Sequence, residues 1–218
     1  MDRLKDKIAV ITGAAKGIGY ETVRTFINEG AQVVMTDLDA EGGTTASEDF
    51  GTSCNFISQD VTDESSWNKL ADHIKTNFGR LDILVNNAGI LATETTQDIE
   101  TTTLSQWRAV QQVNVEGVFM GCRMAVRMMK GTGGSIVNIS STAGIVGSPM
   151  LVAYGASKGA VRLMTKGVAL HCARNRYNIR CNSVHPGPIE TDMGDALLGL
   201  QNYLDGPNLE SKWETLRQ

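Results

Sequence analysis

The sequence has few of the residues from which metal sites and disulfide frameworks are built. It contains four cysteines and three histidines in 218 residues. The cysteines show no Cys-x-x-Cys spacing, and the histidines show no spacing typical of metal ligands. A zinc-dependent mechanism would need a set of Cys, His and Glu ligands that this spacing does not offer. We therefore expect no metal site, and we expect the cysteines to be reduced and to pack in the interior.

Long apolar runs and clusters of basic residues are also missing. No apolar run approaches the roughly 20 residues that span a bilayer, and the start of the chain is charged where a signal peptide carries an apolar core. The net charge is -4, and Lys and Arg are scattered without forming a stripe that could track a phosphate backbone. We therefore expect a cytoplasmic protein that binds neither membranes nor nucleic acids.

The sequence does contain an alternation of short β-branched runs and longer helical patterns, with no linker between them. Its 218 residues and 41% hydrophobic content fit one globular domain, 1–218. The runs that we predict to be strands are Ile8 to Thr12, Gln32 to Thr36, Asn55 to Ser58, Leu81 to Val85, Ser135 to Ile139 and Ile179 to Val184. Helices are predicted after the first strand and over 65–78, 104–130 and 154–174. Because helical crossovers join parallel strands, the sequence predicts a doubly wound α/β fold of the Rossmann type, with helices on both faces of the sheet.

Three glycines, Gly13, Gly17 and Gly19, lie between the first predicted strand and the first predicted helix. In folds of this class ligands bind beyond the carboxyl ends of the strands. Missing side chains at that point let a pyrophosphate approach backbone N–H groups at a helix N-terminus. A turn of this composition alone could equally be a tight connection between two elements.

Asp37, at the end of the second predicted strand, favours the dinucleotide interpretation. Its carboxylate can accept hydrogen bonds from both hydroxyls of an adenosine ribose, and it repels a 2′-phosphate. Asp37-Leu38-Asp39 carries two negative charges and no arginine, which favours NAD over NADP. Lys16 favours NADP instead, because a cation inside the glycine turn can bind a 2′-phosphate.

A tyrosine and a lysine lie four residues apart in Tyr154-Gly-Ala-Ser-Lys158. Positions i and i+4 share one face of a helix, so the phenol oxygen and the ammonium can address the same small volume. The pKa of a free tyrosine is about 10, and a neighbouring cation lowers it by stabilising the phenolate. Such a pair alone is more often helix surface, but the other motifs of this chain favour a proton-transfer site.

With these elements in order, the sequence resembles the classical short-chain dehydrogenase/reductase family over nearly its whole length. The resemblance rests on Thr12-Gly13-x-x-x-Gly17-x-Gly19, Asp60-Val61, Asn86-Asn87-Ala88-Gly89, Asn114, Ser141, Tyr154-x-x-x-Lys158 and Pro186-Gly187. The catalytic residues that it implies are Asn114, Ser141, Tyr154 and Lys158. The cofactor-binding residues that it implies, besides Tyr154 and Lys158, are Gly13, Lys16, Gly17, Ile18, Gly19, Asp37, Leu38, Asp60, Val61, Asn87, Ala88, Gly89, Pro186, Gly187, Ile189 and Thr191.

The resemblance also implies a role for each catalytic residue in hydride transfer between NAD(H) and a secondary alcohol or ketone. Tyr154 would be the acid or base, and Lys158 would lower its pKa and hold the nicotinamide ribose. Ser141 would orient the substrate carbonyl, and Asn114 would complete a water relay. Ser140 is the neighbouring alternative, and Ser141 is preferred because it lies thirteen residues before Tyr154, the spacing familiar in the family.

The substrate must be inferred from segments expected to line the pocket, 90–104, 143–153 and 188–203. Their apolar residues are Ile90, Leu91, Ile145, Val146, Met150, Leu151, Met193, Leu197, Leu198 and Tyr203. Such residues often belong to the core. If they line a cleft, the substrate is an apolar, alicyclic or similarly bulky secondary alcohol or ketone, steroid-like compounds included. The alternatives are an NADPH-dependent ketoreductase of 3-oxoacyl thioesters and a catalytically silent dinucleotide-binding protein.

Two further patterns predict contacts with other chains. The helices at 104–130 and 154–174 spread apolar residues over more than the one face that a sheet covers, which predicts a two-fold four-helix contact in a homodimer or homotetramer. After Pro186-Gly187 the family has a substrate loop, here about 188–216 with helices at 188–203 and 209–216, and then a further helix and a seventh strand. No later β-branched run follows here, so the sixth strand would be a bare edge. We expect the native product to continue by about a strand and a helix, or a second subunit to cover this edge.

Overall fold

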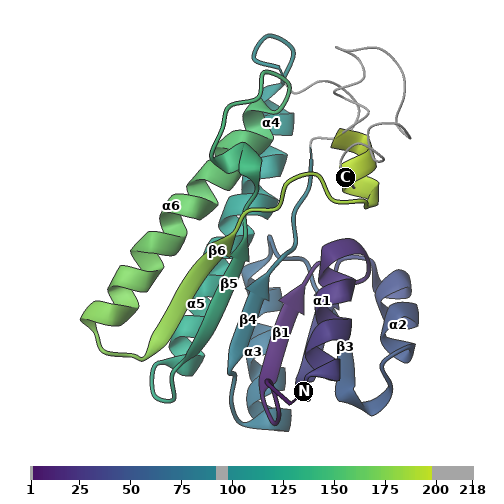
Figure 1. Cartoon of the computed structure of the whole chain (residues 1–218), viewed down its shortest axis with the longest axis vertical. Coiled ribbons are helices and arrows are strands. Elements are labelled where there is room, and N and C mark those ends of the chain that lie inside the picture. Colours follow the sequence, from purple (N-terminus) through teal and green to yellow (C-terminus); the bar gives the residue numbers. More distant parts are fainter. Residues whose placement is uncertain (1, 92–97, 198–218) are drawn as a thin grey trace.

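The structure is a computed structural model that describes residues 2–91 and 98–197. Its strands are β1 (Ile8–Thr12), β2 (Gln32–Asp37), β3 (Cys54–Ser58), β4 (Ile83–Asn86), β5 (Gly134–Ile139) and β6 (Ile179–Val184). They form one parallel sheet in the order β3-β2-β1-β4-β5-β6 (Figure 1). The order reverses between β1 and β4, which confirms the predicted doubly wound Rossmann-type sheet.

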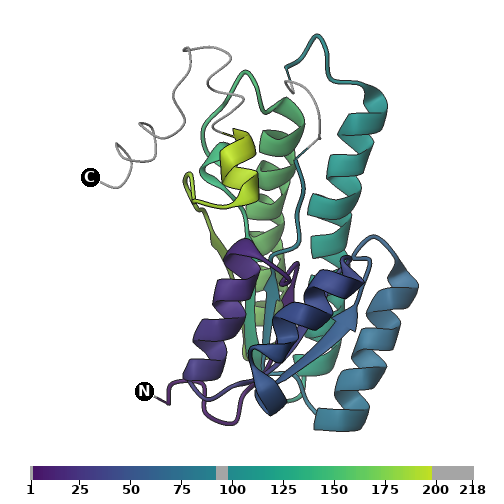
Figure 2. The ribbon, with the colours of Figure 1, turned by 90° about the vertical axis from the view of Figure 1, so that its right-hand side faces the viewer.

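Helices connect the strands and cover both faces of the sheet (Figure 2). They are α1 (Gly17–Asn28), α2 (Ala40–Glu48), α3 (Glu64–Phe78), α4 (Leu104–Gln111), α5 (Val118–Met129) and α6 (Val152–Arg174). A π-helical turn, Gln112–Gly117, joins α4 to α5, and a 3-10 turn, Thr142–Gly144, follows β5. The predicted helix at 104–130 is therefore a continuous helix with one wide turn in its middle.

The sheet separates two apolar cores, because successive residues of a strand point to opposite faces. The core on the side of α3, α5 and α6 includes Val10, Leu84, Ile136, Trp67, Met124 and Val161. The core on the side of α1 and α2 includes Ile11, Val33, Met35, Val23 and Ala46. All five residues of β1 are buried, which explains why the central strand is a continuous apolar run.

β6 lies at an edge of the sheet. Its residues alternate between buried positions such as Ile179 and Cys181 and exposed positions such as Arg180 and Asn182. In the described part of the chain, no strand pairs with the outer side of β6. The bare edge that the sequence predicts is therefore present among these residues, while the predicted helix at 209–216 lies outside them.

One helix was not predicted, and the apolar surface of two others was overestimated. Helix α2 was not predicted because its sequence AEGGTTASE has no apolar stripe. The helix is fixed instead by Asp39, whose Oδ1 accepts a hydrogen bond from the backbone N–H of Gly42 at 2.9 Å, and by close packing on Phe56. The exposed apolar surface of the two long helices is smaller than expected, because Met120 and Met124 are buried in the chain's own core.

Few large apolar side chains of α5 and α6 are exposed. They are Phe119, Leu163 and Leu170, which are 50%, 70% and 71% exposed. In the described residues, no helix is long and apolar enough to cross a membrane.

Candidate active site

The first turns of α6 bring the predicted tyrosine and lysine to the carboxyl edge of the sheet. Tyr154 and Lys158 are only 5% and 4% exposed. The Lys158 Nζ lies 5.5 Å from the centroid of the Tyr154 ring and donates a hydrogen bond to the backbone oxygen of Ile139 at 2.9 Å. The phenol of Tyr154 is hydrogen-bonded to the hydroxyl of Ser141, in the turn that follows β5. A phenol, a hydroxyl and an amino group thus share one buried site.

The two serines after β5 have different environments. The Ser140 Oγ donates a hydrogen bond to the backbone oxygen of Lys158 at 2.8 Å, which holds the start of α6 against the sheet. The Ser141 Oγ accepts a hydrogen bond from the backbone N–H of Ala143 at 3.1 Å and faces Tyr154. The geometry therefore puts Ser141, not Ser140, where it can contact a substrate oxygen.

Burial is the main cause of the pKa shifts of Tyr154 and Lys158. It raises the pKa of Tyr154, although the hydrogen bond with Ser141 opposes the rise. Burial also lowers the pKa of Lys158 to about 8. Ser141 is therefore the neighbour that opposes the effect of burial on Tyr154. That Lys158 lowers the pKa of Tyr154 stays a prediction.

Asn114 lies in the π-helical turn between α4 and α5 and is fully buried. Its Oδ1 accepts a hydrogen bond from the N–H of Ile90 at 2.8 Å, and its Nδ2 donates to the backbone oxygen of Ile90 at 3.0 Å. The same Nδ2 donates to Ser157 Oγ at 3.0 Å, and Ser157 Oγ donates to the backbone oxygen of Tyr154 at 2.7 Å. Asn114 therefore ties the segment after β4 to the helix that carries Tyr154.

The glycine turn between β1 and α1 fits a dinucleotide pyrophosphate. Gly13 has a φ of +62°, and a Cβ built there would lie 2.7 Å from the Cα of Ala88. A Cβ at Gly19 would collide with the backbone oxygen of Gly13, so larger residues would close the turn. The Nδ2 of Asn87 donates to the backbone oxygens of Thr12 and Gly13 at 2.9 Å and 2.8 Å. These contacts hold open backbone next to the first turn of α1, where N–H groups have no partner within the helix.

Asp37 lies beside this turn, as predicted. Its Oδ2 accepts a hydrogen bond from the N–H of Ala15 at 3.0 Å, and its Oδ1 accepts one from the N–H of Asp39 at 3.1 Å. A carboxylate has about four acceptor positions, so capacity remains for two ribose hydroxyls. The adjacent Leu38 is 71% exposed.

At the end of β3, the predicted adenine contacts occupy a tight turn. The Oδ1 of Asp60 accepts a hydrogen bond from the N–H of Thr62 at 2.8 Å. Val61 is buried, and its backbone oxygen accepts a hydrogen bond from Trp67 Nε1 at 2.9 Å. The turn is therefore fixed by the protein itself before any ligand binds.

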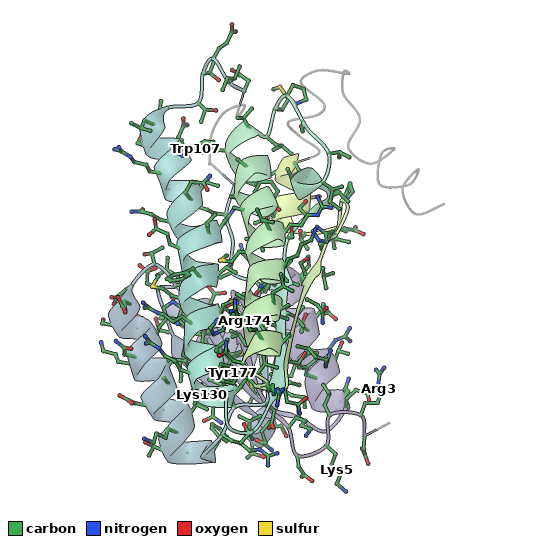
Figure 3. All side chains as sticks on the ribbon, turned by 90° about the vertical axis from the view of Figure 1, so that its left-hand side faces the viewer. Arg3, Lys5, Trp107, Lys130, Arg174 and Tyr177 are labelled. Carbon is green, nitrogen blue, oxygen red and sulfur yellow. The ribbon has the colours of Figure 1, made fainter. Side chains whose placement is uncertain are left out.

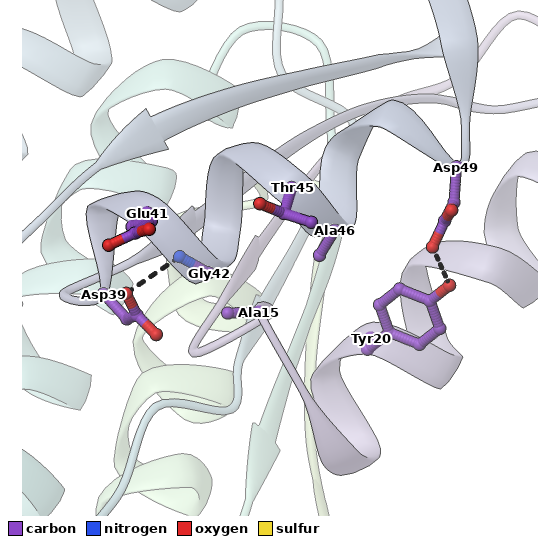
Figure 4. A pocket seen from close by; sticks show the side chains of 8 residues that line it. All are labelled: Ala15, Tyr20, Asp39, Glu41, Gly42, Thr45, Ala46 and Asp49. Atoms are coloured by element: carbon purple, nitrogen blue, oxygen red, sulfur yellow. Dashed lines mark hydrogen bonds between the residues drawn. The ribbon is translucent and has the colours of Figure 1, made fainter.

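A cavity of about 550 Å³ opens between the glycine turn, α1 and α2 (Figure 4). It is lined by Ala15, Tyr20, Asp39, Glu41, Gly42, Thr45, Ala46 and Asp49. The Tyr20 hydroxyl donates a hydrogen bond to Asp49 Oδ2 at 2.6 Å. Three carboxylates thus face the space that adjoins the predicted ribose site.

The segment after β6 returns over the site. The backbone oxygen of Pro186 accepts a hydrogen bond from the N–H of Thr142 at 3.0 Å, and the His185 Nδ1 lies 3.1 Å from the backbone oxygen of Ser141. Both contacts fix the turn that carries Ser141. Of the remaining predicted cofactor residues, Ile18 belongs to the first turn of α1, Gly89 follows β4, and Gly187, Ile189 and Thr191 belong to this returning segment.

The segments that follow Ser141 and Pro186 in the sequence carry exposed apolar side chains. Ile145, Val146 and Ile189 are 52%, 63% and 44% exposed and lie in the segments after β5 and β6. Leu91, in contrast, is buried in the interior. Met150, Leu151, Met193 and Leu197 are half-buried, and Leu198 and Tyr203 lie outside the described residues.

Sequence reasoning missed Ser157, His185 and Asp192, the last of which pairs with Lys16 at 2.6 Å. No spacing signal could have found them, because their contacts join residues 43, 44 and 176 positions apart. For metals, residues 2–91 and 98–197 hold no group of three or more His, Cys, Asp or Glu side chains that could bind an ion.

The family model described as short chain dehydrogenase matches residues 7–199. The chain therefore belongs to the short-chain dehydrogenase/reductase family, as its motifs predicted. It is an oxidoreductase of secondary alcohols and ketones that uses a nicotinamide dinucleotide.

Known relatives with related activities cover most of the chain. The NADP-dependent (R)-specific alcohol dehydrogenase of Lentilactobacillus kefiri is 44% identical over 207 residues, which are 93% of this chain and 81% of the relative. The cyclopentanol dehydrogenase of Comamonas sp. (strain NCIMB 9872) is 43% identical over 211 residues, 95% of this chain and 80% of the relative. The crystal structure of 3-ketoacyl-(acyl-carrier-protein) reductase from Brucella melitensis complexed with NADH is similar with a TM-score of 0.82 and 31% identity, and covers 87% of this chain and 78% of that chain.

Proposed function

We propose that the protein is an NAD-preferring dehydrogenase of apolar, alicyclic or similarly bulky secondary alcohols, which also reduces the corresponding ketones. The observation that carries this proposal is the buried cluster of Ser141, Tyr154 and Lys158 at the carboxyl edge of the sheet, the edge that also carries Asp37 and the glycine turn. These groups meet the three needs of alcohol oxidation, which are a base, a donor that orients the oxygen and a bound dinucleotide.

In the proposed mechanism Tyr154 removes the hydroxyl proton of the alcohol during oxidation and returns it during reduction. Ser141, already hydrogen-bonded to the Tyr154 phenol, donates to the substrate oxygen and holds it beside Tyr154. The bound dinucleotide supplies the carbon that accepts or gives the hydride and, when oxidised, a positive charge. Lys158 would hold the nicotinamide ribose with its ammonium, and that charge would stabilise the phenolate. Asn114 positions the segment after β4, and its part in a water relay remains a prediction.

The preference for NAD rests on the residues around the ribose. Asp37 would accept hydrogen bonds from the ribose hydroxyls. A 2′-phosphate would carry a charge of about -2 towards a cavity lined by Asp39, Glu41 and Asp49. The relative from Lentilactobacillus kefiri is named NADP-dependent, while the Brucella melitensis reductase was crystallised with NADH. The relatives therefore differ, and the support for NAD comes from this chain's own carboxylates.

The proposed substrate class rests on the apolar border of the site. Ile145, Val146 and Ile189 remain largely exposed although they lie next to Ser141 and Pro186, as expected for side chains that a substrate covers. One relative is named a cyclopentanol dehydrogenase, which is a precedent for an alicyclic alcohol. A 3-oxoacyl thioester carrier would instead call for basic side chains at this border, and the exposed residues named here are apolar.

The test is a screen of cyclic and linear secondary alcohols with NAD and with NADP, followed by the absorbance of the reduced nicotinamide. We expect turnover of cyclic alcohols, faster with NAD, and a loss of several orders of magnitude in Tyr154→Phe, because the variant lacks the titrating oxygen. Binding of NADH, followed by its fluorescence, should change little in that variant.

The matched control is Tyr177→Phe, which removes a phenol oxygen beyond the far end of α6 (Figure 3). This variant should keep turnover within about twofold of the wild-type rate. Near-normal activity of Tyr154→Phe would show that Tyr154 is not the acid or base. A preference for NADP would show that Asp37 does not select NAD.

The cytoplasmic location predicted from the sequence stays a prediction.

A further inference from the structure

An ion pair joins the glycine turn to the segment after β6. The Lys16 Nζ lies 2.6 Å from Asp192 Oδ2, although the two residues are 176 positions apart in the chain. The neighbouring Thr191 also approaches this turn, since a Cβ at Gly17 would lie 3.4 Å from its Cγ2. Both views of the ribbon show the short helical segment at 192–197 next to the first turn of α1 (Figures 1 and 2). The ion pair therefore lies at the glycine turn, whose backbone fits a pyrophosphate.

Lys16 is the cation of the glycine turn, and its partners determine where its charge is directed. The hydrogen bond and the charge of Asp192 raise the pKa of Lys16, and the more distant charges of Asp37 and Asp39 act in the same direction. The ammonium is thus oriented towards the segment after β6, with the ribose carboxylates within electrostatic range. It is the protonated form of Lys16 that this surrounding stabilises.

A free Lys16 side chain could reach the adenosine ribose instead. The backbone of Ala15, its immediate neighbour, is hydrogen-bonded to Asp37 Oδ2 at 3.0 Å, so Lys16 starts one residue from the carboxylate that we assign to the ribose. A lysine side chain is long and flexible, and an ammonium there would pair with a 2′-phosphate. NAD carries a hydroxyl at this position and gains nothing comparable from the cation.

We propose that Asp192 is a specificity-determining residue that disfavours NADP by holding Lys16 away from the 2′-phosphate position. The proposal rests on the function proposed above, because it concerns the same dinucleotide site. NADP must break the Lys16–Asp192 pair before it can use Lys16, whereas NAD binds with the pair intact. Cofactor choice thereby depends on a residue of the segment that returns over the site, in addition to the carboxylate at the end of β2.

The test is Asp192→Asn, which keeps the size of the side chain and removes its charge. Specificity is measured as the ratio of kcat/KM with NADP to kcat/KM with NAD for one alcohol. We expect this ratio to rise about threefold, because an exposed ion pair contributes a factor of about five or less. Asp195→Asn removes the same charge three residues further along the segment and should leave the ratio within about twofold.

A double variant shows whether Asp192 acts through Lys16. In a Lys16→Met background, Asp192→Asn should no longer change the ratio, because no cation remains to be released. An equal rise in both backgrounds would mean that Asp192 acts by general charge repulsion, and would overturn the proposal. An unchanged ratio in Asp192→Asn would overturn it as well.

A measurement of cofactor binding tests the role of Asp192 independently of the proposed enzymatic activity. Fluorescence titration with NADH and NADPH gives the same ratio from dissociation constants, without any alcohol substrate. If no alcohol is turned over, the proposed function fails, and the titration still decides the role of Asp192. If the wild-type protein prefers NADPH, the assignment of Asp37 fails, and the change caused by Asp192→Asn remains a separate measurement.

Discussion

Lys158 occupies an unfavourable place for a charged side chain. The residue is 4% exposed, and its ammonium donates at 2.9 Å to a carbonyl oxygen, which is a weaker counterpart than a carboxylate. Burial lowers the pKa of this group from 10.5 to about 8. Groups with shifted pKa values often gather where a protein carries out proton transfer, so the burial of Lys158 at a cost in stability supports the role proposed for it.

Stability should reveal this cost through its dependence on pH. Between pH 8 and 10.5 the unfolded chain binds more protons at this lysine than the folded chain does, so the contribution of Lys158 to the free energy of unfolding rises with pH in that window. Below pH 8 the penalty is fully present. Lys158→Met should therefore be more stable than the wild type at pH 7, and the difference should shrink as the pH rises from 8 towards 10.

Urea unfolding at several pH values measures this difference. Lys166→Met, at an exposed lysine of the same helix, controls for the loss of one charge. A stability difference for Lys158→Met that stays constant from pH 7 to 10 would show that the ammonium is not destabilised by burial in the folded protein.

Motif spacing predicted Tyr154 and Lys158 because the helical period alone brings them to one face. Spacing could not predict the pKa values of these groups, because burial depends on the elements that pack around α6. It could not predict Ser157 as a bridge either. The partner of Ser157 is Asn114, 43 residues earlier, and only the assembled fold brings the two side chains to 3.0 Å.

At the scale of elements, the π-helical turn is the feature that most affects the site. It widens the helix between α4 and α5 at Asn114, and such turns are frequent at functional sites. Gly117 ends this turn against Val61, since a Cβ there would lie 3.0 Å from Val61 Cγ2. The turn therefore links the predicted adenine contact at the end of β3 with α6, the helix that carries Tyr154.

Ser157→Ala tests whether this link positions Tyr154. The variant removes the hydroxyl that accepts from Asn114 Nδ2 and donates to the backbone oxygen of Tyr154. We expect stability to fall by about 1 kcal/mol, the usual value of such a hydrogen bond, and kcat to fall about tenfold with a small change in KM.

Thr165→Val is the matched control for Ser157→Ala. Thr165 also lies on α6, donates to the backbone oxygen of Val161 at 2.7 Å and accepts from Asn138 Nδ2 at 2.9 Å. It lies two turns further from Tyr154, so its loss should lower stability and leave kcat nearly unchanged. Equal losses of kcat in both variants would assign Ser157 a purely structural role.

Apolar periodicity predicted some elements of this fold and not others. Apolar periodicity predicted all six strands and the helices that carry an apolar stripe, because burial selects for those patterns. α2 carries two glycines and no stripe, so a cap at Asp39 and contact with Phe56 form it, and neither contact has a periodic signature. The π-helical turn was missed for a similar reason, because the bonds of Asn114 to Ile90 and Ser157 are tertiary.

At the scale of the molecule, the helices leave two surfaces open within the described residues. One is the outer side of β6, where Arg180, Asn182 and Val184 are exposed. The other is the outer face of α5 and α6, which run side by side (Figure 3). Of these, the helical face is the more apolar, because it presents Phe119, Leu163 and Leu170.

We propose that this helical face forms a two-fold contact between two copies of the chain. Leu163 and Leu170 are seven residues apart on α6 and are 70% and 71% exposed, so they lie on one stripe that the sheet does not cover. Large apolar side chains grouped in this way are costly in water, and two-fold contacts bury such a patch against its own copy.

The protein should therefore have at least the mass of a dimer by light scattering after size-exclusion chromatography. Leu163→Glu combined with Leu170→Glu should reduce that mass to a monomer, because each charge would be buried without a partner. Val146→Glu adds a charge at an apolar residue that is 63% exposed in the segment after β5, and should leave the mass unchanged. A wild-type protein that is monomeric at micromolar concentration would contradict the contact. Unchanged mass in the double variant would instead place the contact on another surface, with the edge of β6 as the next one to substitute.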